Sequence, residues 1–443
     1  MSDTQQRTTL EGHWRPGGRD EDSAVPGVLT IEQNGAASLT LFGGFDTAGP
    51  TAGPVHSSQR LTEFPLVVGA ALDGTPVSLL GVTVTRANRT FTAAMRSIRQ
   101  VLRAERVLHG VALDSPEAAL FTSAQVQIEN LQIWSAQGVE LEISPGSEQQ
   151  TCTATAPEPI TFSCSSLTHT LSHHMSIFDS KAYTDGIRID SATHVVLTLE
   201  SDMPLSHGGF NAALGDWLDL LTFATGEPCA VLSFSLLRPN GEAGNRPRPT
   251  TVRAQWISEP RQPAVRTQIE NFLFSAHDLP VEDCHQRWVK LREKPRAIDM
   301  LLTLTYAPHG YVQNDLLVVA AAVEALHRDL EADLPAKSYT NDKGKPRGPY
   351  YHERALQLAE IPDAEAVGHA LNNDVGAWAT MIKDNRHGLA HGLPKVESDV
   401  TELYRLVRRT QLLLQLVLMS MLGVPAERQR DHAFRRRMPS LPA

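Results

Sequence analysis

The spacing of hydrophobic residues changes once along the chain, and this change most constrains the fold. Up to about residue 257, short runs alternate hydrophobic and polar residues and are separated by Gly, Pro and Ser, as in the strands of a sandwich or barrel. One helical pattern interrupts them at residues 210–225. After about residue 279 the hydrophobic residues recur at helical spacing. The sequence therefore predicts an α+β, multidomain protein, with a β-rich sandwich-like or barrel-like part followed by an all-α bundle of four or five helices.

The length and charge of the chain support this division. A chain of 443 residues is longer than one hydrophobic core usually serves. We expect a β-rich domain over residues 1–278, a helical domain over 279–426 and a basic, flexible tail over 427–443. Residues 1–280 hold 18 Lys and Arg against 29 Asp and Glu, a net charge of −11. The net charge of −10 for the whole chain argues against a protein that mainly coats nucleic acid.

Local patterns in the β-rich part predict individual turns and strands. Asn34-Gly35 lies between two alternating runs, which is a strong hairpin signal. A second turn is predicted near Ala87-Asn88. The run AQVQIENLQIW, residues 124–134, is interpreted as a strand throughout.

Helical periodicity and capping residues predict the helices of the second part. Residues 281–306 form either one helix interrupted at Pro295 or two short helices. Asn314 is expected to cap a helix that begins at residue 313, and Gly392 is expected to end another. The remaining predicted helices cover residues 313–334, 352–360, 363–391 and 398–423.

The sequence also predicts a cytoplasmic protein without membrane contact or cofactor. The opening residues are polar, unlike a signal peptide. The most apolar stretch, residues 412–422, is shorter than the roughly 20 residues that span a bilayer, so we expect a buried helix. The four cysteines lack CxxC spacing, which is typical of reduced core thiols. His169, His173 and His174 are interpreted as exposed polar residues, and whether they or the cysteines bind a metal stays open.

The strongest candidate for chemistry lies at the end of the helix predicted over residues 363–391. Arg386 offers a charged, planar fork of donors that suits phosphate oxygens. His391 can take or give a proton near neutral pH. The pair suits attack of a ribose 2′-hydroxyl on the neighbouring phosphate without a metal. His391 would move protons, and Arg386 would stabilise the extra charge on phosphorus.

Helix geometry favours a site that two copies of the chain share. Five residues turn about 140° on an ideal helix, so Arg386 and His391 point to different sides. His387 and His391 are four residues apart and share a face. Two copies that meet across a two-fold axis would bring two such sets together, which predicts a homodimer.

The Arg-x4-His spacing alone is weak evidence. Arg347 and His352 have the same spacing, but they straddle Gly348-Pro349 at a loop-to-helix junction, so their side chains have no fixed relation. A simpler interpretation of the first pair also stays open. In that interpretation Arg386 caps the helix C-terminus and the histidines are ordinary surface residues.

In its helical setting, the motif resembles the HEPN superfamily of RNases, which carry Arg-[polar]-x3-His at the end of the third main helix of a terminal bundle. The front part resembles the ApeA-type N-terminal domain. The resemblance covers about residues 10–425. The segments that carry it are GHWRP at 12–16, VPGVL at 25–29, SLTLFG at 38–43 and the run at 126–134 that ends in NLQIW.

This resemblance implies a cytoplasmic, dimeric, metal-independent endoribonuclease of the ApeA type, which halts the growth of phage-infected bacteria. It implies that Arg386 and His391 are the catalytic pair. His387 occupies the polar position after the arginine, where related proteins often have Asn, so the proton path stays open. Glu324 matches an acidic position near the HEPN groove and would orient the arginine or a histidine; the alternative is an ordinary solvated glutamate.

The expected substrate is RNA, such as tRNA or another structured RNA. Phosphate contacts would position it without reading its sequence. Tyr350 and Tyr351 are candidates for stacking on a base, whereas Trp378 is expected in the core. The β-rich domain shows no catalytic pattern, and we expect it to bind a phage-derived trigger or to restrain the nuclease. The candidate RNA contacts are Lys343, Lys345, Arg347, Lys383, Asn385, Arg405, Arg408 and Arg409.

Two other classes of function stay open. The bundle could keep the HEPN fold and its dimer contact as a catalytically inactive dimerisation or nucleic-acid-binding module. The intact Arg386 and His391 favour the enzyme, because a pure scaffold has no need of the pair. An antitoxin-like partner protein is disfavoured, because such partners are commonly short single domains.

Overall fold

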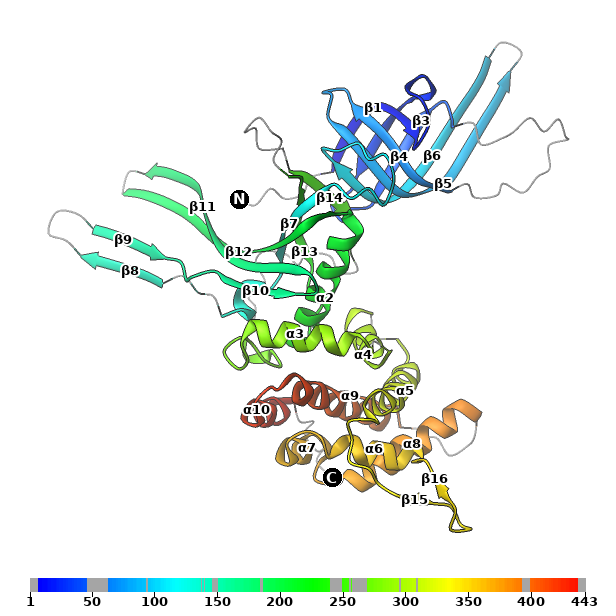
Figure 1. Cartoon of the computed structure of the whole chain (residues 1–443), viewed down its shortest axis with the longest axis vertical. Coiled ribbons are helices and arrows are strands. Elements are labelled where there is room, and N and C mark those ends of the chain that lie inside the picture. Colours follow the sequence, from blue (N-terminus) through cyan, green and yellow to red (C-terminus); the bar gives the residue numbers. More distant parts are fainter. Residues whose placement is uncertain are drawn as a thin grey trace. The chain divides into compact units, whose positions relative to one another are not determined.

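The computed structural model divides the chain into a β-rich unit and a helical unit (Figure 1). The β-rich unit comprises residues 1–129, 139–214 and 230–261, and the helical unit comprises residues 130–138, 215–229 and 262–443. The predicted α+β, multidomain class is confirmed. The residues that the structure describes are 7–45, 63–92, 95–136, 138, 140–145, 150–183, 186–239, 249–254, 256, 269–294, 296–307, 310–392 and 399–436.

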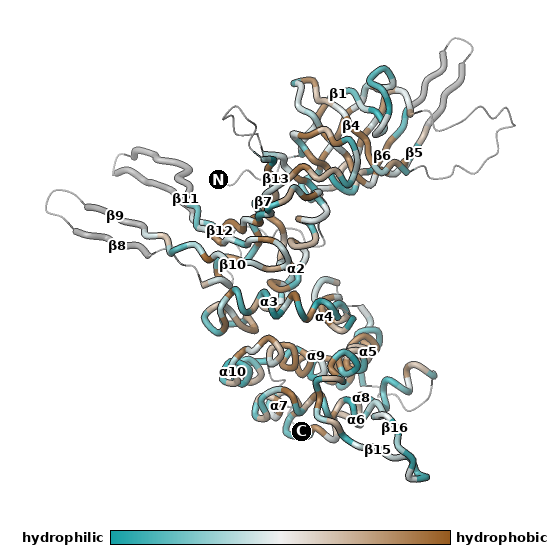
Figure 2. Tube along the Cα trace, viewed as in Figure 1, coloured by the Kyte–Doolittle hydropathy of each residue, from teal (hydrophilic) through white to brown (hydrophobic). Residues whose placement is uncertain are grey.

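Six strands of the β-rich unit close into a barrel, which confirms the barrel-like prediction for this part. The strands pair in the order β6-β3-β2-β1-β4-β5, and β5 pairs with β6 to close the ring. Alternate residues point inward, and Trp14, Leu29, Leu39 and Leu102 are almost completely buried there. In Figure 2, hydrophobic (brown) and hydrophilic (teal) stretches lie close together in the coloured part of the barrel. Their bounds are β1 (Thr8–Pro16), β2 (Val25–Ile31), β3 (Ala37–Phe42), β4 (Glu63–Ala71), β5 (Pro76–Thr92) and β6 (Met95–His109).

Of the two predicted barrel turns, one is confirmed and one is wrong. β2 and β3 form a hairpin at Asn34-Gly35, where Gly35 has a φ of 81° that suits glycine. Ala87 and Asn88 form no turn, because β5 continues through them and pairs with β6 as far as Thr92. The β-forming residues that follow Asn88 keep the ladder intact.

Further strands extend the sheet beyond the barrel in the order β10-β11-β12-β7-β13-β14-β6. The strand predicted over residues 124–134 is wrong at its end. β7 stops at Ile128, Asn130 takes a left-handed φ of 63°, and a short helix follows. The bounds are β7 (Phe121–Ile128), α1 (Leu131–Trp134), β10 (Ile160–Cys164), β11 (Leu167–Tyr183), β12 (Gly186–Leu205), β13 (Val231–Leu237) and β14 (Thr250–Ala254), with β8 (Glu140–Pro145) and β9 (Gln150–Thr155) in a separate hairpin.

The interpretation of the histidine cluster on β11 as exposed is wrong for His169. Its ring is 1% exposed and stacks on Phe162 at 5.1 Å between ring centroids. Burial lowers the pKa of His169 to about 4. His174 is exposed, as expected.

The helical unit gathers segments from three parts of the chain. Trp134 of α1 contacts Trp217 of α2 (His207–Thr225) at 6.3 Å, and the Trp217 ring stacks on His285 at 4.4 Å. Phe223 stacks on Trp288 at 5.6 Å. These buried aromatic contacts explain why residues 130–138 and 215–229 belong to this unit. The compact units mix segments from both sides of residue 278, so they do not test the domain boundary expected there. That boundary stays a prediction.

Most predicted helices are present, with two corrections. The 281–306 region forms two helices, and α2 confirms the predicted helix at residues 210–225. The single helix predicted over residues 363–391 is wrong, because Asn372 and Asn373 have positive φ values and Asp374 caps a new helix. Tyr311, and not Asn314, is the N-cap of α5. The bounds are α3 (Val281–Arg292), α4 (Arg296–Tyr306), α5 (Val312–Leu330), α6 (Tyr351–Ala359), α7 (Ala364–Leu371), α8 (Val375–His391) and α9 (Val400–Leu422), with a small β15–β16 hairpin (Tyr339–Thr340, Pro346–Arg347).

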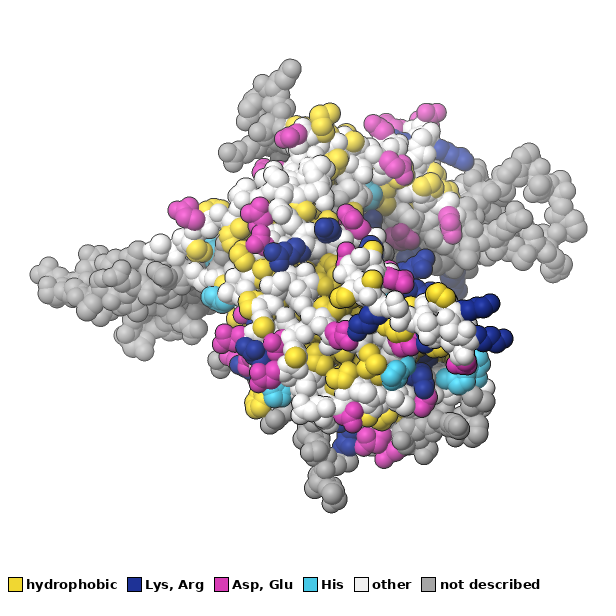
Figure 3. All heavy atoms as spheres, turned by 60° about the horizontal axis from the view of Figure 1, so that its bottom comes forward, with side chains coloured by type: hydrophobic (Ala, Val, Ile, Leu, Met, Phe, Trp, Pro, Cys, Tyr) yellow, Lys and Arg dark blue, Asp and Glu magenta, His cyan; other side chains and the backbone are white. Residues whose placement is uncertain are grey.

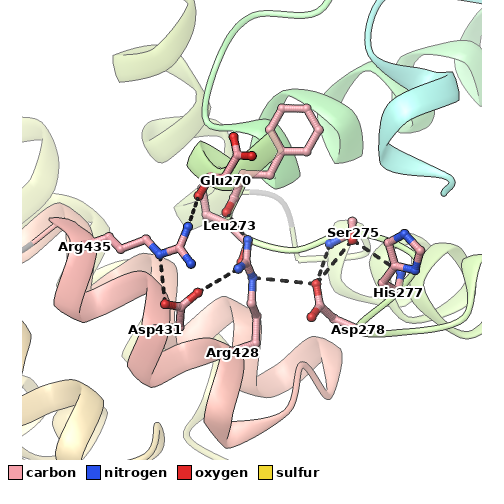
Figure 4. A network of polar contacts seen from close by, with 9 residues as sticks. Glu270, Leu273, Ser275, His277, Asp278, Arg428, Asp431 and Arg435 are labelled. Atoms are coloured by element: carbon pink, nitrogen blue, oxygen red, sulfur yellow. Dashed lines mark hydrogen bonds and ion pairs between the residues drawn. The ribbon is translucent and has the colours of Figure 1, made fainter. Parts of the chain in front are cut away.

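The expectation of a flexible tail is wrong for residues 427–436. They belong to α10 (Ala426–Arg436), whose Gln429, His432 and Ala433 are buried. Arg428 fixes this helix, because its guanidinium donates to the main-chain oxygens of Phe272 and Leu273 (Figure 4). Residues 437–443 lie outside the described part of the chain.

The apolar stretch at residues 412–422 lies in α9, where most of its side chains are buried. The prediction of a buried helix is therefore confirmed. Within the described residues, no helix has both the length and the hydropathy to cross a membrane.

Candidate active site

Arg386, His387 and His391 lie on the last two turns of α8. The buried face of the helix is anchored, since Trp378 donates from Nε1 to Thr410 Oγ1 at 3.0 Å. Gly392 adopts a left-handed conformation and ends the helix, as predicted. His387 and His391 are exposed, and the Arg386 side chain is 39% exposed. The three side chains are thus within reach of a ligand.

Glu324 on α5 binds Arg386 directly. Arg386 Nη2 lies 2.7 Å from Glu324 Oε2. The other carboxylate oxygen of Glu324 accepts from Arg328 at 2.7 Å and from Arg354 of α6 at 3.1 Å. This geometry favours the orienting interpretation of Glu324 over that of a solvated glutamate. One carboxylate also faces three guanidinium groups, so the cluster keeps an excess of positive charge that suits a phosphate.

The ring of Tyr351 on α6 packs against the guanidinium of Arg386. The Arg386 guanidinium lies 4.8 Å from the centre of the Tyr351 ring, and the tyrosine hydroxyl donates to the main-chain oxygen of Ala320. Burial raises the pKa of Tyr351. Tyr351 is half-buried, so stacking of its ring on a base stays a prediction.

The rings of His387 and His391 lie side by side, with 4.6 Å between their centroids. Their shared face, predicted from the four-residue spacing, is confirmed. On the face of the molecule drawn in Figure 3, histidine side chains lie beside lysine and arginine side chains. Such a surface combines proton-transferring and anion-binding groups.

The second Arg-x4-His match does not form a comparable pair. Arg347 is held by both carboxylate oxygens of Glu353 at 2.6 Å and lies 3.6 Å over the ring of Tyr350. His352 Nε2 instead lies 3.4 Å from Thr380 Oγ1. The two side chains therefore have different partners, and the expectation that they lack a fixed relation is consistent with these contacts.

The candidate RNA contacts differ in their surroundings. Asn385 is buried and donates to the main-chain oxygen of Met381, so its predicted contact with RNA is wrong. Arg347 is engaged by Glu353, as described above. Lys343 and Lys345 are exposed in the turn between β15 and β16. The other four are half-buried. Three of them have a polar partner: Lys383 contacts Asp384, Arg405 contacts Glu402 and Arg408 contacts Gln411. Arg409 follows Arg408 on α9.

Sequence reasoning missed Arg328 and Arg354 as partners of Glu324. Arg328 follows Glu324 by four residues on one helix, a spacing that signals an ion pair. Arg354 is 30 residues away on another helix, and no local pattern indicates that contact.

The structure offers no metal cluster within the residues that it describes, where no three His, Cys, Asp or Glu side chains are grouped suitably. Cys164, Cys229 and Cys284 form no disulfide. The side chain of Cys152 lies outside the described part, so its metal binding stays open.

Two family comparisons decide the assignment. The family described as ApeA N-terminal domain 1 matches residues 10–288, which is more than half of the chain. The family described as Apea-like HEPN matches residues 317–428, which include Glu324 and all of α8. The chain belongs to the ApeA family. No curated protein and no solved structure matches it.

The ApeA architecture confirms the resemblance seen in the sequence, with an ApeA N-terminal domain followed by an ApeA-like HEPN domain. It supports a HEPN-family defence protein of nuclease type. Arg386, His387 and His391 lie inside the HEPN match.

Proposed function

We propose that this ApeA-family protein is a metal-independent endoribonuclease of anti-phage defence that cuts RNA from a site shared by two copies of the chain. The observation that carries the proposal is the arrangement at the end of α8. There Arg386 is fixed by Glu324 and Tyr351, and two exposed histidines follow it at one and five residues, His387 and His391. An arginine fixed in this way is a preorganised anion binder.

The proposed reaction is an intramolecular transfer within the RNA. The ribose 2′-oxygen bonds to the adjacent phosphorus, the bond from phosphorus to the 5′-oxygen breaks, and a 2′,3′-cyclic phosphate remains. His391 removes the 2′-hydroxyl proton or donates one to the departing 5′-oxygen. The ion pair with Glu324 uses only Nη2 of Arg386. Arginine has five N–H donors, and the Arg386 side chain is partly exposed, so its other N–H groups can donate to the phosphate oxygens.

A second copy of the chain supplies the group that one α8 helix lacks. Acid and base must stand on opposite sides of the phosphate, whereas His387 and His391 share one face of α8. A two-fold axis beside α8 places the same residues of a second copy across the bound RNA. Lys343, Lys345, Lys383, Arg405, Arg408 and Arg409 then contact phosphates outside the reacting one.

We further propose that the protein acts in the cytoplasm, where it stops the growth of an infected cell. The β-rich unit carries no catalytic pattern in its sequence and is assigned the regulatory part. It binds a phage-derived trigger or restrains the nuclease until infection.

The test compares RNA cleavage by the wild type and by His391→Ala in EDTA. We expect the variant to lose about 10²–10⁴-fold in rate, the usual contribution of a general acid or base. His352→Ala is the matched control, because it belongs to the second Arg-x4-His match and should retain activity. If His391→Ala cuts RNA as fast as His352→Ala does, the site assignment is wrong.

A further inference from the structure

A basic stretch stands out within the acidic β-rich part of the chain. Between Asp73 and Glu105 the sequence contains no acidic residue. The stretch has a net charge of +5, whereas the rest of residues 1–280 carries −16, given the total of −11. Its five arginines are Arg86, Arg89, Arg96, Arg99 and Arg103. They lie on the long hairpin that β5 and β6 form at the barrel.

A β-bulge in β5 places Arg86 on the outer face of the barrel. Val84 pairs with the buried Leu102, whereas Arg86 pairs with Val101, the next residue of β6. Thr85 is therefore an extra residue, and its hydroxyl donates to the main-chain oxygen of Val101 at 3.0 Å. In an unbroken strand, Arg86 would point the same way as Val84, into the barrel. The bulge reverses this orientation, as bulges commonly do for a functional side chain.

Three described arginines consequently share one face. Arg99 and Arg103 alternate with the buried Gln100 and Leu102 on β6, and both are exposed. Arg86 is exposed opposite Val101, midway between them. Two residues of a strand span about 6.6 Å, so the three arginines step along the hairpin at roughly that interval. This step is close to the spacing of phosphates on an extended nucleic-acid strand.

An exposed aromatic side chain borders the arginines. Phe42 of β3 pairs with Arg99 in the register and is 56% exposed. Ser38 and Thr40 lie on the same outer face of β3, opposite Arg103 and Val101. The surface therefore combines cationic, aromatic and hydroxyl groups on a rigid sheet, the combination with which small barrels bind single-stranded nucleic acids.

We propose that the outer face of the barrel, over β3, β5 and β6, binds a single-stranded nucleic acid. Arg86, Arg99 and Arg103 contact successive phosphates, and Phe42 stacks on a base. The binding site is independent of the HEPN site and is built from the ApeA N-terminal domain alone. An acidic protein segment is the less suitable partner, because it would match the charges without using Phe42.

Binding of labelled oligonucleotides to the full-length protein tests the proposal. The probes are a single-stranded DNA and a 2′-O-methyl RNA of about 20 nucleotides, longer than the ~4–16 nucleotides that one small barrel covers. Neither probe has a free 2′-hydroxyl, so the readout does not depend on the proposed RNase reaction. The variant is Arg86→Gln/Arg99→Gln/Arg103→Gln. The matched control, Arg7→Gln/Arg19→Gln/Arg238→Gln, removes three exposed arginines from elsewhere in the same unit.

For single strands, each phosphate contact contributes about 0.7 to the slope of log K against log[salt]. Loss of three contacts should therefore lower this slope by about 2. Near 0.15 M salt, the same loss should weaken binding roughly fiftyfold. Phe42→Ala should weaken binding about tenfold through lost stacking. Thermal unfolding of each variant verifies that the barrel is intact. Equal losses in the two triple variants, or no loss in either, would overturn the proposal. Competition by polyglutamate as strong as by unlabelled oligonucleotide would also overturn it, in favour of an acidic protein partner.

Discussion

The Glu324 carboxylate joins three helices at the candidate active site. It binds Arg328 on its own helix, Arg354 on α6 and Arg386 on α8. We therefore regard Glu324 as a positioning residue, because it acts on phosphate only through Arg386.

Glu324→Gln should reduce RNA cleavage about 10- to 100-fold. The loss is expected mainly in kcat, because a freed Arg386 guanidinium is no longer held where charge develops in the transition state. Arg328→Gln is the matched control: it breaks one contact of the same carboxylate but leaves the bond to Arg386 intact. Steady-state kinetics of both variants measure the effect. An equal loss of kcat in both would show that Glu324 does not act through Arg386.

At this scale the sequence predicts what is local and misses what is distant. Arg386, His387 and His391 could be found because they are close neighbours at the end of one helix. The burial of Asn385 and the contact of Tyr351 with Arg386 could not, since both depend on how α8 and α6 are oriented in the bundle. The contact of Arg354 with Glu324 likewise depends on tertiary packing.

Whole elements were predictable where the hydrophobic pattern is strong. α9 has 13 buried residues among its 23, and its limits agree closely with the prediction. The break between α7 and α8 was missed because helical spacing continues across Asn372 and Asn373. These two residues adopt left-handed backbone conformations, which asparagine tolerates but which the hydrophobic pattern does not indicate. α10 was missed for the opposite reason, since its charged sequence is typical of a solvated tail.

Arg428→Ala should release α10 from the segment that precedes α3. Arg428 bonds the main-chain oxygens of Phe272 and Leu273, and both residues are buried (Figure 4). Leaving such acceptors without a donor costs about 1–3 kcal/mol each. We expect the free energy of unfolding of the helical unit to fall by about 2–4 kcal/mol in urea titrations. Arg435→Ala, at a more exposed position of α10, should cost under about 1 kcal/mol. Similar losses in both variants would contradict this account.

His432 should make the stability of α10 sensitive to acid. Burial, followed by the nearby Arg436 and Arg428, lowers the pKa of His432 to about 3. Below about pH 6.5 the unfolded chain binds a proton that the folded chain excludes, so stability falls as the pH decreases toward the folded pKa. From about pH 6.5 to about pH 5 the loss is about 2 kcal/mol at ~1.4 kcal/mol per pH unit.

His432→Leu should remove this part of the pH dependence. The measurement is the free energy of unfolding in urea at both pH values. His277→Leu, which replaces an exposed histidine of the same unit, is the matched control. A slope that is the same in wild type and His432→Leu would contradict the prediction.

For the whole molecule, the order of a β-rich part and a helical part was predictable from the change in hydrophobic period. The assignment of residues 130–138 and 215–229 to the helical unit was not. It rests on Trp134, Trp217 and Phe223, whose aromatic partners are distant in the sequence. The barrel closure between β5 and β6 was hidden as well, because the predicted turn at Ala87-Asn88 splits β5.

The shared site predicts how mixed dimers behave. After exchange of subunits between wild type and an equal amount of His391→Ala, a site that needs His391 from both copies is intact in about a quarter of dimers. Cleavage by the mixture should then be roughly a quarter of the rate of pure wild type at the same total protein concentration. Sedimentation of the full chain should show two copies per particle. A fall to only one half, as expected of independent sites, would contradict the shared site.

The central claim is that the 2′-hydroxyl of the RNA is the nucleophile and that Arg386 and His391 serve it without a metal. The most direct measurement is cleavage of one RNA in EDTA, with and without a 2′-O-methyl group at the cut position, followed by analysis of the product ends. The account predicts cutting of the unmodified RNA alone, with a 2′,3′-cyclic phosphate on the upstream product. Cutting of the methylated RNA, or loss of all cutting in EDTA that returns with Mg²⁺, would contradict it.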